Sequence, residues 1–334
     1  MTYCVAFLLD AGLVFASDSR TNAGVDYIST YSKMHVFQPA PDRLFVLLAA
    51  GNLATTQAVL NRIQRDLHEQ VGMAAAPPSR DRSTPPTAAT PTTATPTTAT
   101  PATAAAKAAG PCGDLGLADE APKPGLLSDV GLEIDLAADA LPDQSPAAAP
   151  RRPGTAAVEQ PDLISARYLF EAADYIGRIS VAVQDQFAAK LRQSGGSAQA
   201  SFILGGQIQG EEHGLYLIYP QGNAVMATRD TPFLQIGESK YGKPPLDYVG
   251  HCGLSLEDAA RLCLISQVIT RRSNLTVGPP FELALLPADG LRISRRVKLE
   301  KDSPEIRRSM EIWKACMQDG LRRLPRFAWE EDPL

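Results

Sequence analysis

The second residue of the chain carries the functional groups of a self-contained catalyst. If the initiator Met1 is removed, Thr2 becomes the first residue and has both a hydroxyl and a free α-amine. An α-amine has an ordinary pKa of about 7.7 to 8, so it accepts the hydroxyl proton near neutral pH and later returns it to a leaving amine. Thr2 is therefore a candidate nucleophile with its own base, although a Met-Thr start is common and by itself indicates little.

Two charged residues further along the chain are candidates to act on Thr2. Asp18 ends a predicted strand that pairs with the strand starting at Thr2, and Lys33 begins another short apolar run. We expect Lys33 to lie beside Thr2 and to tune its hydroxyl electrostatically, while Asp18 keeps the lysine charged. The alternative is a structural role for each, as a turn-capping aspartate and a solvated lysine.

A glycine supplies the remaining part of such a site. Acyl transfer needs a backbone N–H directed at the oxygen that gains negative charge. Gly51 stands between the apolar run 44–50 and a helical pattern. A turn from strand to helix presents N–H groups where the helix dipole favours an anion. Gly51 is thus a candidate oxyanion-hole residue, although a glycine after a strand is more often only a turn.

The elements that must position these residues are short strands and amphipathic helices. Apolar runs at 2–9 and 13–17 flank an Asp-Ala-Gly turn, which predicts a β-hairpin at the start of the chain. The run 44–50 predicts a third strand, and the residues after it recur with helical spacing. Residues 163–191 share this spacing, which predicts a second long helix that packs antiparallel to the first.

The second half of the chain also predicts strands interspersed with helices. Four short strands, expected to form an antiparallel meander, are predicted at 201–209, 215–219, 224–228 and 233–236. Ser255 begins a pattern typical of a helix N-terminus. A last hairpin is predicted from strands at 281–286 and 291–297, and a basic helix is predicted at 304–324. This order favours an α+β fold in which two antiparallel sheets stack between helix layers.

Residues 73–160 differ in composition from the rest of the chain. Proline is crowded there, and residues 90–104 repeat Thr-Pro-Thr-Thr-Ala, which cannot form a packed core. We therefore expect one domain, made of 2–72 and 161–330, that carries a disordered insertion. Within the insertion, the acidic and mildly apolar segment 126–141 is expected to be a transient helix or a docking motif.

Composition and charge argue against several classes of protein. The 334 residues include 32 basic and 37 acidic side chains, and the net charge of −5 gives no electrostatic case for nucleic acid or an anionic membrane. A secretory signal and a membrane-spanning run are not evident, so we expect a cytoplasmic protein. The five cysteines form no C-x-x-C pair and the four histidines are scattered, so a disulfide framework or a metal site is not indicated.

The motifs around the candidate residues are similar to those of a known family. The N-terminal third of proteasome β-subunits and of the bacterial HslV peptidase resembles TYCVA at 2–6, ASDSRTNAG at 16–24, and the runs 32–33 and 48–51. The Anbu family of bacterial proteasome-related proteins is more similar still, through AGNLATTQA at 50–58, SFILGGQ at 201–207 and TPFLQIGESKYGK at 231–243. The likeness covers both halves of the chain outside the insertion.

This resemblance implies an Ntn-hydrolase fold, which is a four-layer αββα sandwich, and threonine-peptidase chemistry. Thr2 matches the nucleophile of the family. Asp18 and Lys33 match the acid and the lysine beside it, and Gly51 matches the oxyanion glycine. The implied mechanism needs no metal and no organic cofactor.

The resemblance also implies a substrate and an assembly. Thr21, Asn22 and Ala50 match the edges between which a peptide or protein substrate is held as an added β-strand. Family members assemble from copies of themselves into rings or open spirals, so we expect a homo-oligomer. An ATPase or ligase-like partner is not identified by the sequence.

The chain departs from the proteasome pattern in two places. Where β-subunits have Gly-Ser-Gly, this chain has 237–239, so Glu238 or Ser239 is expected in the supporting role. Where β-subunits carry an aspartate and a serine on a late loop, this chain has 272–278, in which Thr276 replaces the serine and the acid is missing. Both departures argue against vigorous protein degradation.

Three functions remain open at this point. The residues favour a proteasome-type threonine peptidase that acts through Thr2. The second is an Ntn amidohydrolase that acts on a small amide or isopeptide. The third is a catalytically inactive, proteasome-like scaffold, which retention of Met1 would favour.

Overall fold

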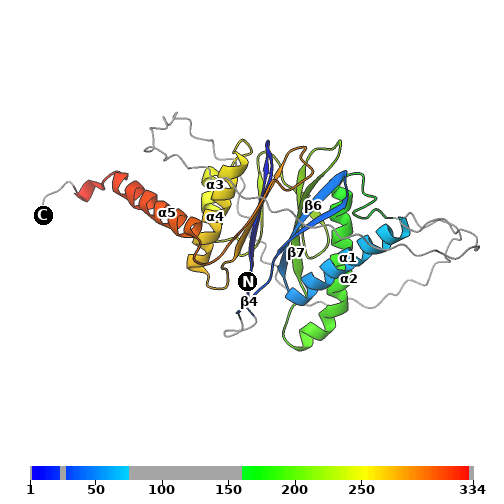
Figure 1. Ribbon diagram of the computed structural model, residues 1–334. Helices are drawn as coiled ribbons and strands as arrows, with labels where there is room; N and C mark the ends of the chain where they lie inside the picture. The colour runs from blue at the N-terminus through cyan, green and yellow to red at the C-terminus, as the bar shows by residue number, and fades with distance from the viewer. Residues whose placement is uncertain (1, 23–27, 75–159, 331–334) are drawn as a thin grey trace, which may run out of the picture. The chain divides into compact units, whose positions relative to one another are not determined.

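Two five-stranded antiparallel sheets lie face to face between helices (Figure 1). The computed structural model describes residues 2–22, 28–74 and 160–330. The predicted insertion lies outside these residues except at its edges, where Met73 and Ala74 complete a helix and Gln160 begins the next described segment. None of the described helices is both long and apolar enough to cross a membrane.

The first sheet is built around the N-terminal hairpin. In spatial order its strands are β10 (Phe233–Gly237), β1 (Tyr3–Leu9), β2 (Gly12–Asp18), β11 (Phe281–Pro287) and β12 (Arg295–Leu299). β2 is buried along its whole length because a sheet neighbour flanks it on each side and its two faces meet other layers. The loop of the last hairpin is longer than predicted, because β12 begins at residue 295 and not at residue 291. Leu291 has a positive φ of 42°, which a strand does not accept.

The second sheet has the order β5 (Met34–Ala40), β6 (Arg43–Gly51), β7 (Ala200–Ile208), β8 (Gly214–Ile218) and β9 (Ala224–Met226). β3 (Arg20–Asn22) and β4 (Ile28–Thr30) form a separate pair. The predicted four-strand meander is wrong in its last member, because β10 leaves this sheet and pairs with β1. A tight turn between Thr228 and Thr231, followed by Pro232, redirects the chain there.

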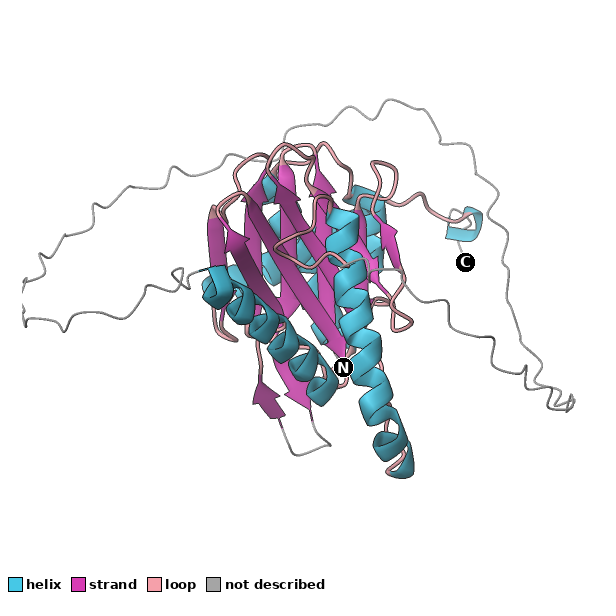
Figure 2. Ribbon diagram, turned by 90° about the vertical axis from the view of Figure 1, so that its right-hand side faces the viewer, coloured by secondary structure: helices cyan, strands magenta, loops and turns pink. Residues whose placement is uncertain are grey.

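Two helices cover the second sheet and cross in front of its strands (Figure 2). They are α1 (Leu53–Ala74) and α2 (Leu169–Gln193). Arg62 contacts Gln186 and Asp66 contacts Tyr175, so the helices run antiparallel as predicted. α2 begins six residues later than its spacing predicts, because a turn closed by the Asp162 carboxylate precedes it.

Three helices lie on the side of the first sheet. They are α3 (Lys243–Val249), α4 (Leu256–Ser273) and α5 (Pro304–Arg323), and a short 3₁₀ helix, η1 (Ala328–Glu330), follows α5. The Ser255 hydroxyl caps α4 by accepting from the Asp258 N–H at 3.1 Å, as its sequence pattern indicates. The sequence analysis predicted no helix over α3, which contains Pro244 and Pro245. Both stand in its first turn, where proline is tolerated.

Three apolar cores separate the layers. One joins α1 and α2 to the second sheet, one joins the two sheets, and one joins the first sheet to α4. The core between the sheets is tight: a Cβ at Gly205 of β7 would lie 2.6 Å from the ring of Phe15 in β2. The four-layer αββα sandwich is therefore confirmed.

Candidate active site

Thr2 stands immediately before β1, between the strands that flank β1. Its carbonyl oxygen accepts a hydrogen bond of 2.6 Å from the Glu238 N–H. Next to it, Tyr3 pairs with Gly237 at the end of β10. Gly237 has a φ of +85°, and a Cβ there would overlap the carbonyl of Thr2. The absence of a side chain at Gly237 thus lets β10 approach the first residue of the proposed site.

The Gly237→Ala variant should unfold more readily than the wild type. A positive φ alone costs an alanine about 1–2 kcal/mol, and the overlap with Thr2 should bring the total to roughly 3 kcal/mol or more. Gly195→Ala is the matched control, since Gly195 has a φ of +72° but open space around its Cβ position. Urea unfolding measures both. Equal losses in the two variants would show that contact with Thr2 contributes nothing.

Asp18 and Lys33 form a buried ion pair beside the start of β1. The Lys33 Nζ lies 2.6 Å from Asp18 Oδ1 and 2.6 Å from the Arg20 carbonyl oxygen. Asp18 also accepts hydrogen bonds from the Tyr3 N–H at 2.9 Å and the Gly278 N–H at 3.2 Å. Burial raises the pKa of the Asp18 carboxyl, and the Lys33 ammonium and the two N–H groups oppose that rise. One carboxylate therefore joins the lysine, β1 and the late loop.

A second buried carboxylate holds the segments that carry this pair. Glu282 in β11 accepts hydrogen bonds from the hydroxyls of Ser19 at 3.0 Å and Ser32 at 3.1 Å, and it pairs with Arg296 at 3.2 Å. Ser19 follows Asp18, and Ser32 precedes Lys33. The sequence analysis missed Glu282, although a glutamate in the second position of the apolar run 281–286 is a signal that could have indicated it.

Gly51 ends β6 and leads directly into α1. The Asn52 side chain accepts a hydrogen bond of 3.1 Å from the Thr55 N–H and so caps the helix. The strand, turn and helix expected around Gly51 are therefore present. The Ala49 N–H donates to the Lys33 carbonyl at 3.0 Å, which ties the segment before Gly51 to the catalytic lysine candidate.

A cavity of about 270 Å³ brings five of the ten predicted site residues together. Its lining includes Thr2, Lys33, Gly51, Thr21 and Ala50. Asp18 lies outside the lining and reaches the cavity through its bond to Lys33. Asn22 ends β3, but its side chain is outside the described residues.

Further lining residues were not predicted from the sequence, and they set the character of the cavity. His35 is one of them, and burial lowers its pKa, so its ring is uncharged near neutral pH. Tyr31, Leu53 and Leu60 add apolar surface. The Thr21 Oγ1 is buried and finds no hydrogen-bond partner among the described residues. A hydroxyl in this state is available to a bound molecule.

The two loops that depart from the proteasome pattern contact each other. The Asn274 amide donates to Glu238 Oε2 at 2.9 Å, and Asn274 Oδ1 accepts from the Thr276 hydroxyl at 2.6 Å. The late loop has no acid of its own between residues 272 and 278, and the carboxylate of Glu238 on the facing loop lies against it. Ser239 lies next to it, where its N–H donates to the Gly237 carbonyl at 3.1 Å. Of the two supporting candidates, Glu238 is the one whose side chain joins the loops.

A metal centre is not evident in the described ranges. They contain no group of three or more His, Cys, Asp or Glu side chains placed to hold a metal ion. The chemistry that the cavity supports is that of a hydroxyl, an ammonium group and backbone N–H groups.

Among solved structures, this chain is similar to Anbu proteins from several bacteria. An Anbu complex from Pseudomonas aeruginosa, described as a helical assembly, is 31% identical with a TM-score of 0.65 over 99% of this chain and 100% of that one. Anbu from Yersinia bercovieri, described as an ancestral β-subunit, is 30% identical with a TM-score of 0.65 over 98% and 99%. A Gly-1 mutant of Anbu from Hyphomicrobium sp. strain MC1 is 29% identical with a TM-score of 0.66 over 98% and 99%. No protein-family model and no curated protein matches the chain.

Proposed function

Because this chain belongs to the Anbu family of proteasome-related proteins, we propose that it is an N-terminal threonine hydrolase that cleaves peptide bonds. The observation that carries the proposal is the shared cavity of Thr2, Lys33 and Gly51. A hydroxyl, a buried ammonium group paired with Asp18 and a strand-to-helix turn are the parts that acyl transfer requires.

The proposed reaction begins with removal of Met1, which frees the α-amine of Thr2. The Thr2 Oγ attacks the carbonyl carbon of the peptide bond while the α-amine takes the hydroxyl proton. The carbonyl oxygen becomes an oxyanion that accepts a hydrogen bond from the Gly51 N–H. The C–N bond then breaks, and the leaving amine receives the proton from the α-amine. An ester on Thr2 remains.

Hydrolysis of the ester completes the cycle. Water loses a proton to the α-amine and attacks the ester carbonyl. The ester C–O bond breaks, the acid product leaves, and Thr2 Oγ regains the proton. Lys33 stabilises the negative charge that develops on Thr2 Oγ in both steps, and Asp18 and Glu282 are positioning residues for it.

The substrate is proposed to bind as an extended peptide. β3 and the end of β6 supply two edges of the cavity, through Thr21 on one side and Ala50 on the other. Backbone N–H and C=O groups at such edges pair with a peptide strand. The Thr21 hydroxyl offers an additional hydrogen bond to it. One side chain of the peptide would enter the cavity.

The protein is further proposed to work as a homo-oligomer in the cytoplasm. The similar protein from Pseudomonas aeruginosa is described as a helical assembly, and this supports self-assembly of the present chain. The described cysteines Cys4, Cys252, Cys263 and Cys316 are free thiols, which fits a reducing compartment.

Intact mass spectrometry with a β-lactone tests the proposed nucleophile. The purified protein should lack Met1, and the β-lactone should add once, as an ester on the N-terminal Thr2 peptide. Burial raises the pKa of the Cys4 and Cys263 thiols, so they are poor competitors. The exposed Cys316 is a possible competitor, and peptide mapping distinguishes it from Thr2.

Thr2→Ala is the control for this experiment and should carry no N-terminal adduct. Retention of Met1 in the native protein would contradict the proposal and favour the inactive scaffold. Turnover of γ-glutamyl amides but not of peptide amides would instead favour the small-amide hydrolase. An adduct confined to Cys316 would also contradict the proposal.

Because Glu238 and Asn274 are in contact beside the start of β1, we expect the activity of Thr2 to depend on the charge of these two side chains. Asn274→Asp should lower kcat/KM by at least about tenfold, because two carboxylates then face each other. Adding Glu238→Ser, which restores the hydroxyl and acid of the proteasome pattern, should recover most of that loss. A steady-state assay across pH measures both variants, and no rescue in the double variant would show that the two loops act independently.

A further inference from the structure

A buried chain of hydrogen bonds begins at Tyr3, the residue that follows the proposed nucleophile. The Tyr3 hydroxyl bonds to the hydroxyl of Ser266 in α4 and accepts a bond of 2.7 Å from the amide of Gln235 in β10. The Ser266 hydroxyl donates in turn to the Gly242 carbonyl oxygen at 2.5 Å. Both hydroxyl-bearing side chains are fully buried. We call Tyr3, Gln235, Gly242 and Ser266 the Tyr3 network.

The donors in this network follow one direction. A hydroxyl has a single proton to donate. Because Ser266 gives its proton to the Gly242 carbonyl, the bond between the two hydroxyls takes its proton from Tyr3. Burial raises the pKa of the Tyr3 phenol, so the phenol keeps that proton near neutral pH. Tyr3 is therefore the donor that ties β1 to α4.

The network reaches the loop that holds the Thr2 carbonyl. Gly242 belongs to the same loop as Glu238, whose N–H donates to the Thr2 carbonyl oxygen at 2.6 Å. A Cβ at Gly242 would lie 2.5 Å from the Tyr3 hydroxyl oxygen and 2.6 Å from that of Ser266. The loop thus packs directly on the two hydroxyls, so a shift of either hydroxyl also shifts the loop.

The network also reaches the late loop, through α4. The Thr270 hydroxyl, one turn after Ser266, donates to the Ser266 carbonyl oxygen at 2.8 Å. The Asn274 N–H donates to the Thr270 carbonyl oxygen at 2.7 Å, at the end of the helix. The Asn274 side chain then contacts Glu238. The two loops and α4 therefore form a closed ring of contacts that includes Tyr3.

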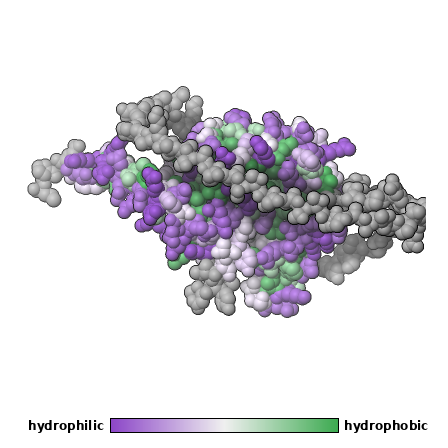
Figure 3. Space-filling model, viewed as in Figure 1, coloured by the Kyte–Doolittle hydropathy of each residue, from purple (hydrophilic) through white to green (hydrophobic). Residues whose placement is uncertain are grey.

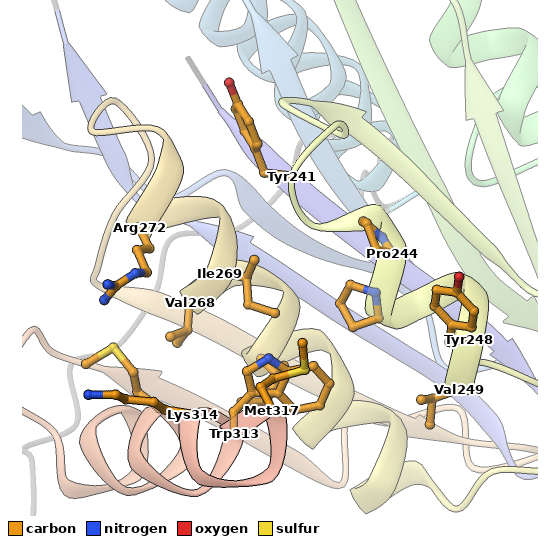
Figure 4. Close-up of a pocket in the computed structure, with 13 residues that line it drawn as sticks. Tyr241, Pro244, Tyr248, Val249, Val268, Ile269, Arg272, Trp313, Lys314 and Met317 are labelled. Carbon is orange, nitrogen blue, oxygen red and sulfur yellow. The ribbon is translucent and has the colours of Figure 1, made fainter. Parts of the chain in front are cut away.

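The network lies on the inner face of α4. Val268, Ile269 and Arg272 lie on the outer face, where they border a hollow of about 660 Å³ (Figure 4). Hydrophobic side chains lie between hydrophilic ones over the neighbouring α5 (Figure 3). Ser266 does not line the hollow and is not exposed. A substitution in the network therefore leaves the outer surface of this helix layer unchanged.

A nucleophile at a chain end depends on its neighbour for its position. Removal of Met1 leaves Thr2 joined to the protein by one peptide bond, to Tyr3, and chain ends are poorly ordered unless they are tied down. Acyl transfer requires the attacking atom to be held within about 0.5 Å of its productive place. The position of Tyr3 thus decides whether Thr2 meets the substrate carbonyl.

We propose that Tyr3 is a positioning residue for Thr2, and this inference rests on the proposed function. The Tyr3 hydroxyl, held by Ser266 and the neighbouring loop, fixes the start of β1 and so aims the Thr2 hydroxyl at the substrate. It touches no reacting atom. Substrate binding is proposed to use the cavity edges at Thr21 and Ala50, so loss of the Tyr3 hydroxyl should slow the reaction and leave binding unchanged.

Tyr3→Phe tests this role, because it removes only the hydroxyl. With a fluorogenic peptide, kcat should fall roughly 10- to 100-fold while KM changes less than about twofold. Tyr175→Phe is the matched control: Tyr175 is also buried, and its hydroxyl donates to Asp66 at 2.9 Å, but it does not line the cavity. Both variants should lower the midpoint of urea unfolding, and only Tyr3→Phe should lower kcat.

A double variant tests whether the two hydroxyls act as one unit. Ser266→Ala should lower kcat by a factor similar to that of Tyr3→Phe, because each removes the same bond. Tyr3→Phe/Ser266→Ala should then lose no more than the larger of the two single losses. Losses that multiply would contradict the proposal, since they would mean that the two hydroxyls act separately.

Hydrogen exchange measured by mass spectrometry reads the position of Thr2 without a substrate. The Glu238 N–H is bonded to the Thr2 carbonyl, so it should exchange about tenfold faster in Tyr3→Phe than in the wild type. In Tyr175→Phe its exchange should be unchanged. Equal exchange in Tyr3→Phe and the wild type would overturn the positioning role, whatever reaction the protein catalyses.

Failure of this inference and failure of the proposed function give different results. A wild-type protein without a β-lactone adduct on Thr2 would contradict the proposed function, and the kinetic role of Tyr3 would fall with it. A wild-type protein that carries the adduct, together with a Tyr3→Phe variant of unchanged kcat, would overturn the role of Tyr3 alone. An equal loss of kcat in Tyr175→Phe would also overturn it, because the effect would then be one of general stability.

Discussion

The Thr2→Ala variant should hydrolyse peptide substrates at least about 10³-fold more slowly than the wild type, because it lacks the attacking oxygen. Thr2→Ser keeps a hydroxyl and an α-amine on the same residue and should retain measurable turnover. Thr2 stands outside β1 and is only partly buried, so neither change should disturb the sheet. Initial rates with a fluorogenic peptide measure the effect.

A control is needed because a contaminating peptidase would hide this loss. Urea unfolding should give the same midpoint for Thr2→Ala and the wild type, which shows that the variant is folded. A β-lactone should inhibit the wild type and leave any residual rate in Thr2→Ala unchanged. Full turnover in a folded Thr2→Ala protein would assign the activity to another residue.

Asp18→Ala should destabilise the fold by about 3–5 kcal/mol, because it leaves the Lys33 ammonium buried without its carboxylate. It should also abolish detectable turnover, since Lys33 is then free to move from Thr2. The matched control is Asp42→Ala, which breaks a more exposed pair with Arg43 and should cost less than about 1 kcal/mol. Urea unfolding and initial rates give the two readouts.

A double variant separates the structural role of the pair from its catalytic role. Asp18→Ala/Lys33→Met removes both charges, and apolar replacement of a buried pair is often neutral for stability. We expect stability to recover relative to Asp18→Ala and turnover to remain absent. Recovery of turnover together with stability would mean that Lys33 serves the fold alone.

The fold followed from the sequence where local pattern and tertiary packing agree. The N-terminal hairpin, β6 with α1, and the Ser255 cap of α4 have turn residues, periodicity and burial that all indicate one structure. The errors arose where pairing with a distant segment determines which sheet a strand joins. β9 and β10 are both short, mostly apolar strands, and only the pairing of β10 with β1 shows to which sheet it belongs.

In the candidate site, too, local pattern indicates some residues, while others are recognised only through contacts with distant parts of the chain. Thr2 and Gly51 are recognisable from their places at the start of a strand and at a strand-to-helix turn. Glu282 is 250 residues from Ser32, and no local pattern indicates their hydrogen bond. Likewise, the sequence shows that an acid is missing near Asn274, but only the contact between the loops shows that Glu238 faces it.

The close packing of Gly205 against Phe15 fixes how the two sheets lie relative to each other, and the proposed site depends on that alignment. Thr2 directly precedes β1 and Asp18 ends β2 in one sheet, while Lys33 and Gly51 border the other sheet, so the proposed reacting groups are divided across the plane where Gly205 meets Phe15. A methyl group added in that plane would make one sheet slide against the other and would pull the lysine away from the nucleophile. The rate of hydrolysis would therefore act as a gauge of sheet alignment, responsive to changes that touch no reacting atom.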